Sequence, residues 1–344
     1  MDIFVFLCAM SIFPTQYSTL RASALGEYIG EKYGFTGLSC RLLVRNVSDT
    51  YVLSHRNEKY IFKIYRDSHR TLDEIRGEVE LLQLLRENNI GVAAPIPDKT
   101  GNVIQQFQAA EGIRNGVLFE YAQGKVILLP NDKQLTIIGR ELAALHNVTA
   151  NRTLRHPRIT YDTYTTLERP IKIIADRFAD LPEEYAFLKK LAADTTRALD
   201  ELNPSTFSHG YCHYDFMPKN FHIDESDKVT MFDFDWAGRG YLANDLMVFH
   251  IQYFWVHYYK LITREEADRC LSVFLQGYRQ LRSISPAELE AIPHLGVMFL
   301  IFGLGFYEDN FDDFSNTFLG PRFLRERVQL IRQWVESPPS PAPL

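Results

Sequence analysis

Four polar residues with fixed spacing carry the clearest chemical signal in this sequence of 344 residues. His213, Asp215 and Asn220 lie in one loop, and Asp233 ends the hairpin that follows it. Because a hairpin folds back on the loop before it, the two carboxylates and the amide can converge on one point. Mg²⁺ prefers hard oxygen ligands and keeps several waters, so one Asp and one Asn can complete a site with phosphate oxygens. The other Asp could then take a proton from an attacking hydroxyl.

The surroundings of these residues distinguish a site from a solvated surface. His213 by itself is best explained as a hydrogen-bonded structural histidine rather than as a base. Asp215, Asn220 and Asp233, however, stand together between apolar segments. Burying three such groups without a metal or hydrogen-bond partners would cost several kcal/mol. We therefore predict that they serve a common ligand.

Composition excludes several classes of protein. The chain is 46% hydrophobic and 23% charged, which is typical of a globular protein. Its 37 Lys and Arg residues are outnumbered by 43 Asp and Glu residues, so the net charge of −6 provides no positive field to attract nucleic acid. The four cysteines are scattered and form no C-x-x-C pair, so neither a zinc site nor a disulfide framework is predicted. A reducing, cytoplasmic environment is expected.

The two ends of the chain differ in composition from the rest. Residues 3–13 are apolar, but Asp2 stands where a signal peptide would carry basic residues, and the run is too short to span a bilayer. We expect residues 1–12 to form an apolar extension that is neither a signal peptide nor a membrane anchor, and we expect no membrane partner. A simpler hypothesis is that Met10 is the biological start of the protein. The Pro-rich residues 337–344 are expected to form a disordered tail.

The elements that must position the polar residues fall into two parts. The first part has helical periodicity and strand patterns, with helices at residues 20–33 and 72–88 and strands at 38–44, 49–53, 59–65 and 116–121. The second part is mainly helical, with helices at residues 132–146, 183–202 and beyond 245, and a hairpin of strands 221–224 and 229–233. The boundary is expected near residues 123–131.

The pattern His213-x-Asp215-x-x-x-x-Asn220, with Asp233 after the next hairpin, resembles a known family signature. It is similar to the loop of the aminoglycoside phosphotransferase and choline kinase-like superfamily, nearest its homoserine kinase-like and stress response kinase branches. The resemblance implies that Asp215 is the catalytic base and that Asn220 and Asp233 hold magnesium. It also implies that His213 braces the loop and that Asp245, at a following helix, supports it.

The resemblance extends upstream and covers roughly residues 13–335. Lys63, in an apolar strand, is similar to the lysine that holds the α- and β-phosphates of ATP, and Glu78 is similar to its helix-borne partner. Alternatives stand beside both assignments. Lys63 could be an exposed strand lysine, and Glu78 could belong to a solvated helix face, with Glu80 as a rival for its role.

Two further segments of the first part resemble nucleotide contacts of the family. The strand over residues 118–122 resembles the hinge whose backbone meets adenine, which implies contacts from Glu120, Tyr121 and Ala122. Residues 45–50 would have to cover the phosphates with backbone N–H groups and hydroxyls such as that of Ser48, because this segment is not glycine-rich.

The fold class that the resemblance implies is α+β, a bilobal protein kinase-like fold. A small lobe of antiparallel strands with one helix, residues 13–123, would bind the nucleotide. A larger, mainly helical lobe, residues 124–336, would carry catalysis and bind the substrate. ATP and Mg²⁺ are the implied cofactors.

Three departures from the family pattern concern the substrate side of the site. Tyr214 stands where the family usually has Gly, and Met217 stands where it often has a second His. Asp235 is an additional acid that could contact the substrate. An ammonium group of the acceptor could also be received by an acidic run that contains Glu308, Asp309, Asp312 and Asp313.

The predicted reaction is transfer of the γ-phosphoryl group of ATP to a hydroxyl of a small molecule. An amino alcohol, a hydroxy amino acid or an aminoglycoside-like compound would be the acceptor. Two alternatives are a protein Ser/Thr kinase of the stress response type and a catalytically inactive nucleotide-binding module. A haloacid dehalogenase-type phosphohydrolase, with Asp233 and Asp235 as its D-x-D pair, is disfavoured because the pair comes after 232 residues and no βαβ series surrounds it.

Overall fold

The computed structural model describes residues 15–311 and 319–337, which form two compact units. The first unit comprises the chain up to Leu72 together with Pro95–Tyr121. The second comprises Asp73–Ala94 together with the chain from Ala122 onward. The predicted apolar extension over residues 1–12 lies outside the described residues, and so does the predicted start at Met10. The predicted tail lies outside them beyond Ser337.

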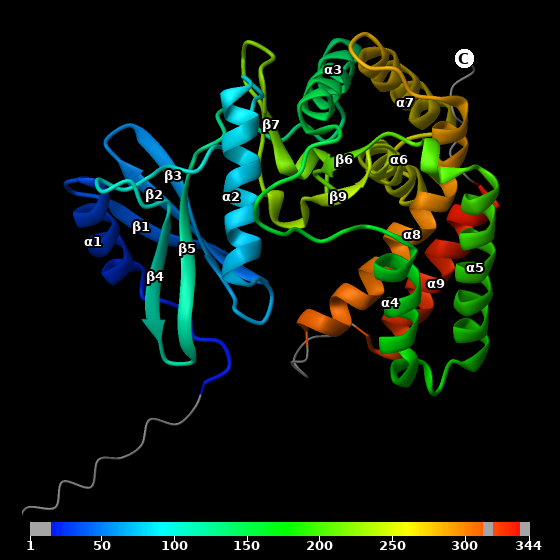
Figure 1. The fold of residues 1–344 in the computed structure, drawn as a ribbon, viewed down its shortest axis with the longest axis horizontal. Coiled ribbons are helices and arrows are strands. Elements are labelled where there is room, and N and C mark those ends of the chain that lie inside the picture. The colour runs from blue at the N-terminus through cyan, green and yellow to red at the C-terminus, as the bar shows by residue number, and fades with distance from the viewer. Residues whose placement is uncertain (1–14, 312–318, 338–344) are drawn as a thin grey trace, which may run out of the picture. The chain divides into compact units, whose positions relative to one another are not determined.

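The first unit is built on an antiparallel sheet of five strands in the order β1-β2-β3-β5-β4, with α1 beside it (Figure 1). These elements are α1 (Ala22–Tyr33), β1 (Ser39–Arg45), β2 (Ser48–His55), β3 (Glu58–Tyr65), β4 (Ile104–Ala109) and β5 (Gly112–Glu120). Successive side chains of a strand point to opposite faces, so alternate apolar residues meet α1 in one core. The fully buried members of that core are Leu25, Ile29, Tyr51, Leu53, Phe62, Ile64 and Leu118.

A buried arginine links several parts of the first unit. Arg114 of β5 is 1% exposed and donates hydrogen bonds to the carbonyl oxygens of Tyr65 in β3 and of Ser18. Its guanidinium also forms ion pairs with Asp49 of β2 at 3.1 Å and with Glu111 at 3.2 Å. Because a buried charge is tolerated only with such partners, Arg114 holds strands β2, β3 and β5 and the segment before α1 around one group.

The second unit is mainly helical and contains two small antiparallel ribbons (Figure 1). Its longer helices are α2 (Leu72–Glu87), α3 (Asp132–Thr149), α5 (Pro182–Glu201), α6 (Ala243–Tyr258), α7 (Arg264–Arg279), α8 (Pro286–Asn310) and α9 (Pro321–Glu336). The first residue of α2, Leu72, is counted with the first unit. Its short helical segments are η1 (Tyr164–Glu168), α4 (Arg169–Ile173), η2 (Ala175–Phe178), η3 (Pro204–Thr206), η4 (Pro218–Asn220) and η5 (Phe234–Trp236). In the ribbons, β6 (His209–Cys212) pairs with β9 (Gly238–Tyr241), and β7 (Phe221–Ile223) pairs with β8 (Val229–Met231).

Helix α2 is grouped with the second unit, whereas the division of the sequence at residue 123 placed it in the N-terminal part. The segment after the helix is hydrogen-bonded to β8, because Ala93 N–H donates to the carbonyl oxygen of Met231 and Met231 N–H donates to that of Gly91. Within the helix, a Cβ on Gly77 would lie 2.8 Å from the carbonyl oxygen of Pro157, so only glycine permits this close approach.

Helix α8 is long and apolar enough by composition to cross a membrane, but 67% of its apolar window is buried inside the structure. Such burial is typical of the core helix of a globular domain. Trp334 of α9 is fully buried and donates its indole N–H to the carbonyl oxygen of Pro293 in α8 at 2.8 Å. Helix α8 therefore packs as a core element of the second unit.

Replacing Arg114 by Met should lower the free energy of unfolding of the protein by about 3 to 5 kcal/mol, because Asp49 and Glu111 would remain as buried charges without their cation. Denaturant-induced unfolding followed by circular dichroism would measure the change. Arg322→Met is the matched control, since Arg322 is 92% exposed in its pair with Glu326 and should contribute less than about 1 kcal/mol. Equally small losses in both variants would contradict the structural role of Arg114.

Candidate active site

The loop between β6 and β7 carries the predicted catalytic residues, and His213 ties it to the end of β8. His213 is fully buried, and the backbone N–H of Asp215 donates to its Nδ1 at 3.3 Å. The proton of the ring must therefore be on Nε2, which donates to the carbonyl oxygen of Phe232 at 3.0 Å. Through these two bonds His213 links the backbone of Asp215 to the end of β8, and its role as the brace of the loop stays a prediction.

Asp245, in the first turn of α6, holds the same loop through hydrogen bonds to its backbone. Its carboxylate accepts the backbone N–H of His213 at 2.8 Å and that of Tyr214 at 2.6 Å. The third donor is Nε2 of His146 in α3 at 3.0 Å, and Nδ1 of that ring accepts from the hydroxyl of Tyr278 at 2.8 Å. Asp245 is completely buried, and these three donors compensate for the removal of its charge from water.

The structure accounts for Tyr214, which stands where the family usually has Gly. Its φ of +60° lies in the left-handed region that favours glycine. Its ring is fully buried and stacks on the ring of Tyr161, with centroids 3.3 Å apart and an angle of 6° between the planes. The side chain of Tyr214 therefore fills the interior of the second unit and does not project into the substrate side of the loop.

Asp215 is held by two neighbours in its own loop. Its Oδ2 accepts a hydrogen bond from Nδ2 of Asn220 at 2.6 Å and lies 2.8 Å from Nζ of Lys219. Because both neighbours bind Oδ2, Oδ1 is the carboxylate oxygen left for an incoming hydroxyl. The Asp215 side chain as a whole is 14% exposed.

The ion pair between Asp215 and Lys219 affects the protonation of both groups. Burial raises the pKa of Asp215 above its ordinary value, and the charge of Lys219 offsets part of that increase. For Lys219, burial acts to lower the pKa, but the charge and hydrogen bond of Asp215 outweigh it and the pKa lies above its usual value. Lys219 therefore stays positively charged beside Asp215 at neutral pH.

Asp233 lies next to Asn220 because the residue before it is bonded to that asparagine. Phe232 N–H donates to the backbone carbonyl of Asn220 at 2.9 Å. Asp233 itself has a left-handed backbone with φ of +60°, an uncommon conformation that Asp tolerates better than most residues. Its negative charge acts on both Asp215 and Lys219, so the structure brings the predicted base and the predicted metal ligands together.

The donor atoms of Asn220 and Asp233 fit a magnesium ion. The amide nitrogen of Asn220 is bonded to Asp215, which directs the amide oxygen away from that carboxylate. An amide oxygen and a carboxylate are the hard ligands that Mg²⁺ prefers. Within residues 15–311 and 319–337, no group of three or more His, Cys, Asp or Glu side chains could hold a metal. Phosphate oxygens and waters would therefore have to complete the coordination.

Two side chains from residues 158–161 hold the turn that follows Asp233. The guanidinium of Arg158 donates to the carbonyl oxygens of Asp235 and Ala237 at 2.5 and 2.7 Å. The hydroxyl of Tyr161 donates to the carbonyl oxygen of Trp236 between them. Asp235 is 5% exposed, so the additional acid is a buried part of this turn. Arg158 also donates to the carbonyl oxygen of Phe234 at 3.1 Å, so two buried side chains fix four consecutive carbonyl groups.

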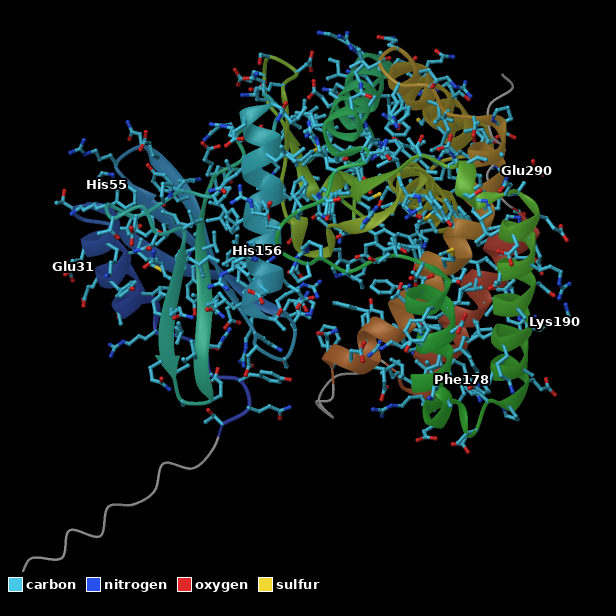
Figure 2. All side chains as sticks on the ribbon, in the orientation of Figure 1. Glu31, His55, His156, Phe178, Lys190 and Glu290 are labelled. Carbon is cyan, nitrogen blue, oxygen red and sulfur yellow. The ribbon has the colours of Figure 1, made fainter. Side chains whose placement is uncertain are left out.

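The acids of α2 have different surroundings. Glu78 is 1% exposed, so its assignment to a solvated helix face is wrong, and its Oε2 lies 3.8 Å from the guanidinium of Arg158. Glu80 instead accepts hydrogen bonds from the backbone N–H groups of Arg155 and His156, and Figure 2 shows His156 alongside α2. Glu78 is therefore the better candidate of the two for pairing with the predicted phosphate lysine, and that pairing stays a prediction.

In the first unit, Lys63 is centred in β3 and is 7% exposed, so the alternative of an exposed strand lysine is wrong. Its ammonium lies 5.0 Å from the ring centroid of Tyr65, two residues along the strand. Across the ladder, Thr50 is paired with Lys63 and Ser48 with Tyr65. Since directly opposed and alternate residues share a face, Ser48 and Lys63 lie on the same face of the sheet.

The segment over residues 45–50, predicted to form a loop that covers phosphates, is mostly strand. β1 ends at Arg45 and β2 begins at Ser48, so only Asn46 and Val47 form the turn. The predicted loop was too long because residues 48–50 continue the ladder with β3. Ser48 is buried in that ladder.

The predicted hinge begins at the end of β5. Glu120 is paired with Tyr60 of β3, and the ring of Tyr121 lies 5.4 Å from the ammonium of Lys59. The carbonyl oxygen of Ala122 accepts a hydrogen bond from Nδ1 of His222 at 2.6 Å. That carbonyl already accepts one hydrogen bond within the second unit, so the N–H group of Ala122 is the simpler choice for the predicted contact with adenine.

Two acids near the end of α8 form ion pairs with arginines. Asp309 forms a bidentate pair with Arg169 at 2.7 and 2.8 Å, and Glu308 forms one with Arg177 at 2.8 and 3.2 Å. Their charges are therefore already compensated, and the expectation that they receive an ammonium group is not supported. Asp312 and Asp313 lie outside the described residues.

Sequence reasoning missed three residues that support the site. Lys219 lies four residues after Asp215, and this spacing of opposite charges could have suggested the ion pair. Arg158 and His146 gave no such signal, because their partners Asp235 and Asp245 are 77 and 99 residues away in the chain. Only the folded chain brings these groups together.

Replacing Asp245 by Asn should lower the free energy of unfolding by about 1 to 3 kcal/mol, because an amide has one acceptor oxygen where three buried donors need two. Thermal denaturation of the two proteins would measure the loss. The control is Asp268→Asn, since that side chain is 34% exposed in its pair with Arg264 and should change stability little. An unchanged melting temperature for Asp245→Asn would show that the loop does not depend on this carboxylate.

Comparison with known proteins agrees with this geometry. Residues 40–291 match the model of the phosphotransferase enzyme family. An uncharacterized protein of Deinococcus radiodurans is 30% identical over 94% of this chain and 93% of its own length. The amicoumacin kinase of Bacillus subtilis is 26% identical over 76% of this chain and 77% of its own length.

A solved structure shows the same fold. The amicoumacin kinase hAmiN, in complex with AMP-PNP, Ca²⁺ and Ami, is similar with a TM-score of 0.71 at 20% identity, covering 92% of this chain and 94% of that one. The predicted α+β kinase-like fold and the resemblance to the aminoglycoside phosphotransferase superfamily are thereby confirmed. A haloacid dehalogenase-type hydrolase is excluded. The chain belongs to the phosphotransferase enzyme family and is a kinase of that family.

Proposed function

We propose that this protein transfers the γ-phosphoryl group of ATP, with Mg²⁺, to a hydroxyl of a small molecule. The observation that carries the proposal is the cluster of Asp215, Asn220 and Asp233, which the loop and the end of β8 bring together. A base beside two oxygen ligands is the arrangement that phosphoryl transfer needs, since catalysis there depends on positioning and on stabilising charge.

Asp215 would act as the general base through Oδ1. The acceptor hydroxyl would donate its hydrogen bond to that oxygen, because Asn220 and Lys219 occupy Oδ2. As the oxygen of the acceptor bonds to the γ-phosphorus, the bond from that phosphorus to the β,γ-bridging oxygen would break, ADP would leave, and the proton of the hydroxyl would pass to Asp215. Lys219 would hold the carboxylate in its ionised form until then and would place a positive charge beside the transferred group.

The family resemblance and the side chains described above indicate which residues would hold the nucleotide. Asn220 and Asp233 would bind magnesium, which would neutralise phosphate charge and orient the γ-phosphoryl group for attack. Lys63 would bind the α- and β-phosphates, with Glu78 as its partner and Ser48 on the same face of the sheet. Glu120, Tyr121 and the N–H of Ala122 would meet adenine. The presence of AMP-PNP in the similar amicoumacin kinase supports ATP as the donor.

The acceptor would be an amino alcohol, a hydroxy amino acid or an aminoglycoside-like compound. The similar kinases that act on small molecules support this class, as does the amicoumacin kinase relative in particular. Glu308 and Asp309 already pair with arginines, so they would not bind ammonium groups of the acceptor. This favours acceptors whose binding does not depend on acids at the end of α8.

Asp215→Ala and Asp233→Ala should each abolish turnover of ATP while leaving the fold intact, because the first removes the base and the second a metal ligand. The measurement is magnesium-dependent ATP consumption against a panel of amino alcohols, hydroxy amino acids, aminoglycosides and a generic protein acceptor. Asp194→Asn, on the surface of α5 and 39% exposed, is the control and should retain full activity. Unaltered turnover in either active-site variant would refute the assignment, and phosphorylation of the protein acceptor alone would indicate a protein kinase.

Lys219→Met should move the acid limb of the pH profile of kcat/KM to higher pH. The base must be ionised to accept a proton, and loss of the neighbouring cation raises the pKa of Asp215 further above its ordinary value. Lys219→Arg retains the charge and should keep the profile close to that of the wild-type protein. An acid limb that shifts to lower pH in Lys219→Met, or that does not move, would contradict the role of this ion pair.

A further inference from the structure

We propose that Tyr161 and Tyr214 form a pair of positioning residues that links the loop of the base Asp215 to the turn of the metal ligand Asp233. The inference rests on the proposed function, because it assigns a role in that site to two residues that touch neither substrate nor metal. It concerns the residue at which this chain departs most visibly from the family pattern.

Tyr214 is the member of the pair on the loop of the base. It immediately precedes Asp215, and its backbone N–H is bonded to Asp245 at 2.6 Å. The main chain at Tyr214 is therefore held at one point by a buried carboxylate. The ring adds a second point of attachment, because it lies fully buried in the interior of the second unit.

Tyr161 is the member of the pair on the turn of the metal ligand. Its backbone N–H donates to the carbonyl oxygen of Arg239 in β9 at 2.8 Å. Its hydroxyl donates to the carbonyl oxygen of Trp236, three residues after Asp233. The backbone and the hydroxyl of Tyr161 are therefore both bonded to the segment that follows Asp233. If that segment moved, the ring of Tyr161 would move with it.

The stacked rings connect the two halves. Their centroids are 3.3 Å apart and their planes are nearly parallel. Phe302 of α8 packs edge-on against both rings, with centroids 5.5 Å from Tyr161 and 5.8 Å from Tyr214. A displacement of either ring would open this contact, so a shift of the turn after Asp233 is resisted by the loop that carries Asp215.

Two unfavourable features of Tyr214 support a role for its ring. Its left-handed backbone would be adopted more easily by Gly. Its hydroxyl is buried and has no hydrogen-bond partner within the described part of the chain. Neither feature favours Tyr at this position, so the favourable contribution must come from the ring and its stack on Tyr161. Phe would supply the same ring without the buried hydroxyl.

Four single variants separate the contributions of ring, hydroxyl and backbone. Tyr214→Gly removes the ring and relaxes the backbone, and Tyr214→Phe keeps the ring. Tyr161→Phe keeps the stack but removes the hydroxyl that holds Trp236. Tyr164→Phe is the control, because Tyr164 is 58% exposed in η1.

The readouts are kcat for ATP consumption, the Mg²⁺ concentration for half-maximal rate, the increase in melting temperature caused by Mg²⁺ and ATP, and the melting temperature without ligand. We expect Tyr214→Gly and Tyr161→Phe to lower kcat about tenfold or more and to require more Mg²⁺, because small displacements of reacting groups are costly. Tyr214→Phe and Tyr164→Phe should behave as the wild-type protein does. The double variant Tyr161→Phe, Tyr214→Gly should be less impaired than the product of the single effects, since both act on one link.

The outcomes distinguish the inference from the proposed function. If the wild-type protein neither consumes ATP nor is stabilised by Mg²⁺ and ATP, the proposed function is refuted and the inference with it. If the wild-type protein is active and Tyr161→Phe changes only the melting temperature without ligand, the pair is merely structural and the inference alone is refuted. Normal kcat and Mg²⁺ requirement in folded Tyr214→Gly would refute it equally.

Discussion

The buried carboxylate of Asp245 is the constraint on which the site of this protein depends. It receives the N–H groups of His213 and Tyr214 and the ring of His146, so α3, α6 and the loop before Asp215 meet at one charge. A buried carboxylate is tolerated only when its donors are all in place. The loop is therefore held in one conformation, although its Tyr214 adopts a backbone geometry that is unfavourable for a residue with a Cβ.

The same principle of buried polar groups with fixed partners governs the turn that follows Asp233. Arg158 and Tyr161 donate to four successive carbonyl groups there, and Arg158 also lies 3.8 Å from Glu78 in α2. Glu78, the turn and the loop with Asp215 thus belong to one connected network within the second unit. Such preorganisation suits phosphoryl transfer, in which the protein contributes mainly position and electrostatic stabilisation.

Three features that bear on the acceptor side of the site have separate physical explanations. Tyr214 turns its ring into the core of the second unit, where it is fully buried. Lys219 supplies a positive charge to Asp215 from within the loop itself. The acids at the end of α8 pair with Arg169 and Arg177, so they stabilise the packing of short helical segments instead of forming an acidic surface for a cationic acceptor.

Local patterns in the sequence determined the elements of the fold and the reactive residues. The helices near residues 22–33 and 72–87 and the hairpin of β7 and β8 followed from periodicity, and Asp215, Asn220 and Asp233 followed from their spacing. Strand β4, rich in Gln, had too weak an apolar alternation to be predicted, and the length of the turn after β1 depended on pairing with β3. Only the tertiary structure decided which groups hold the site, namely His146, Arg158 and Tyr161. Their partners lie 75 to 99 residues away, and such contacts arise from the packing of whole elements, which no local pattern encodes.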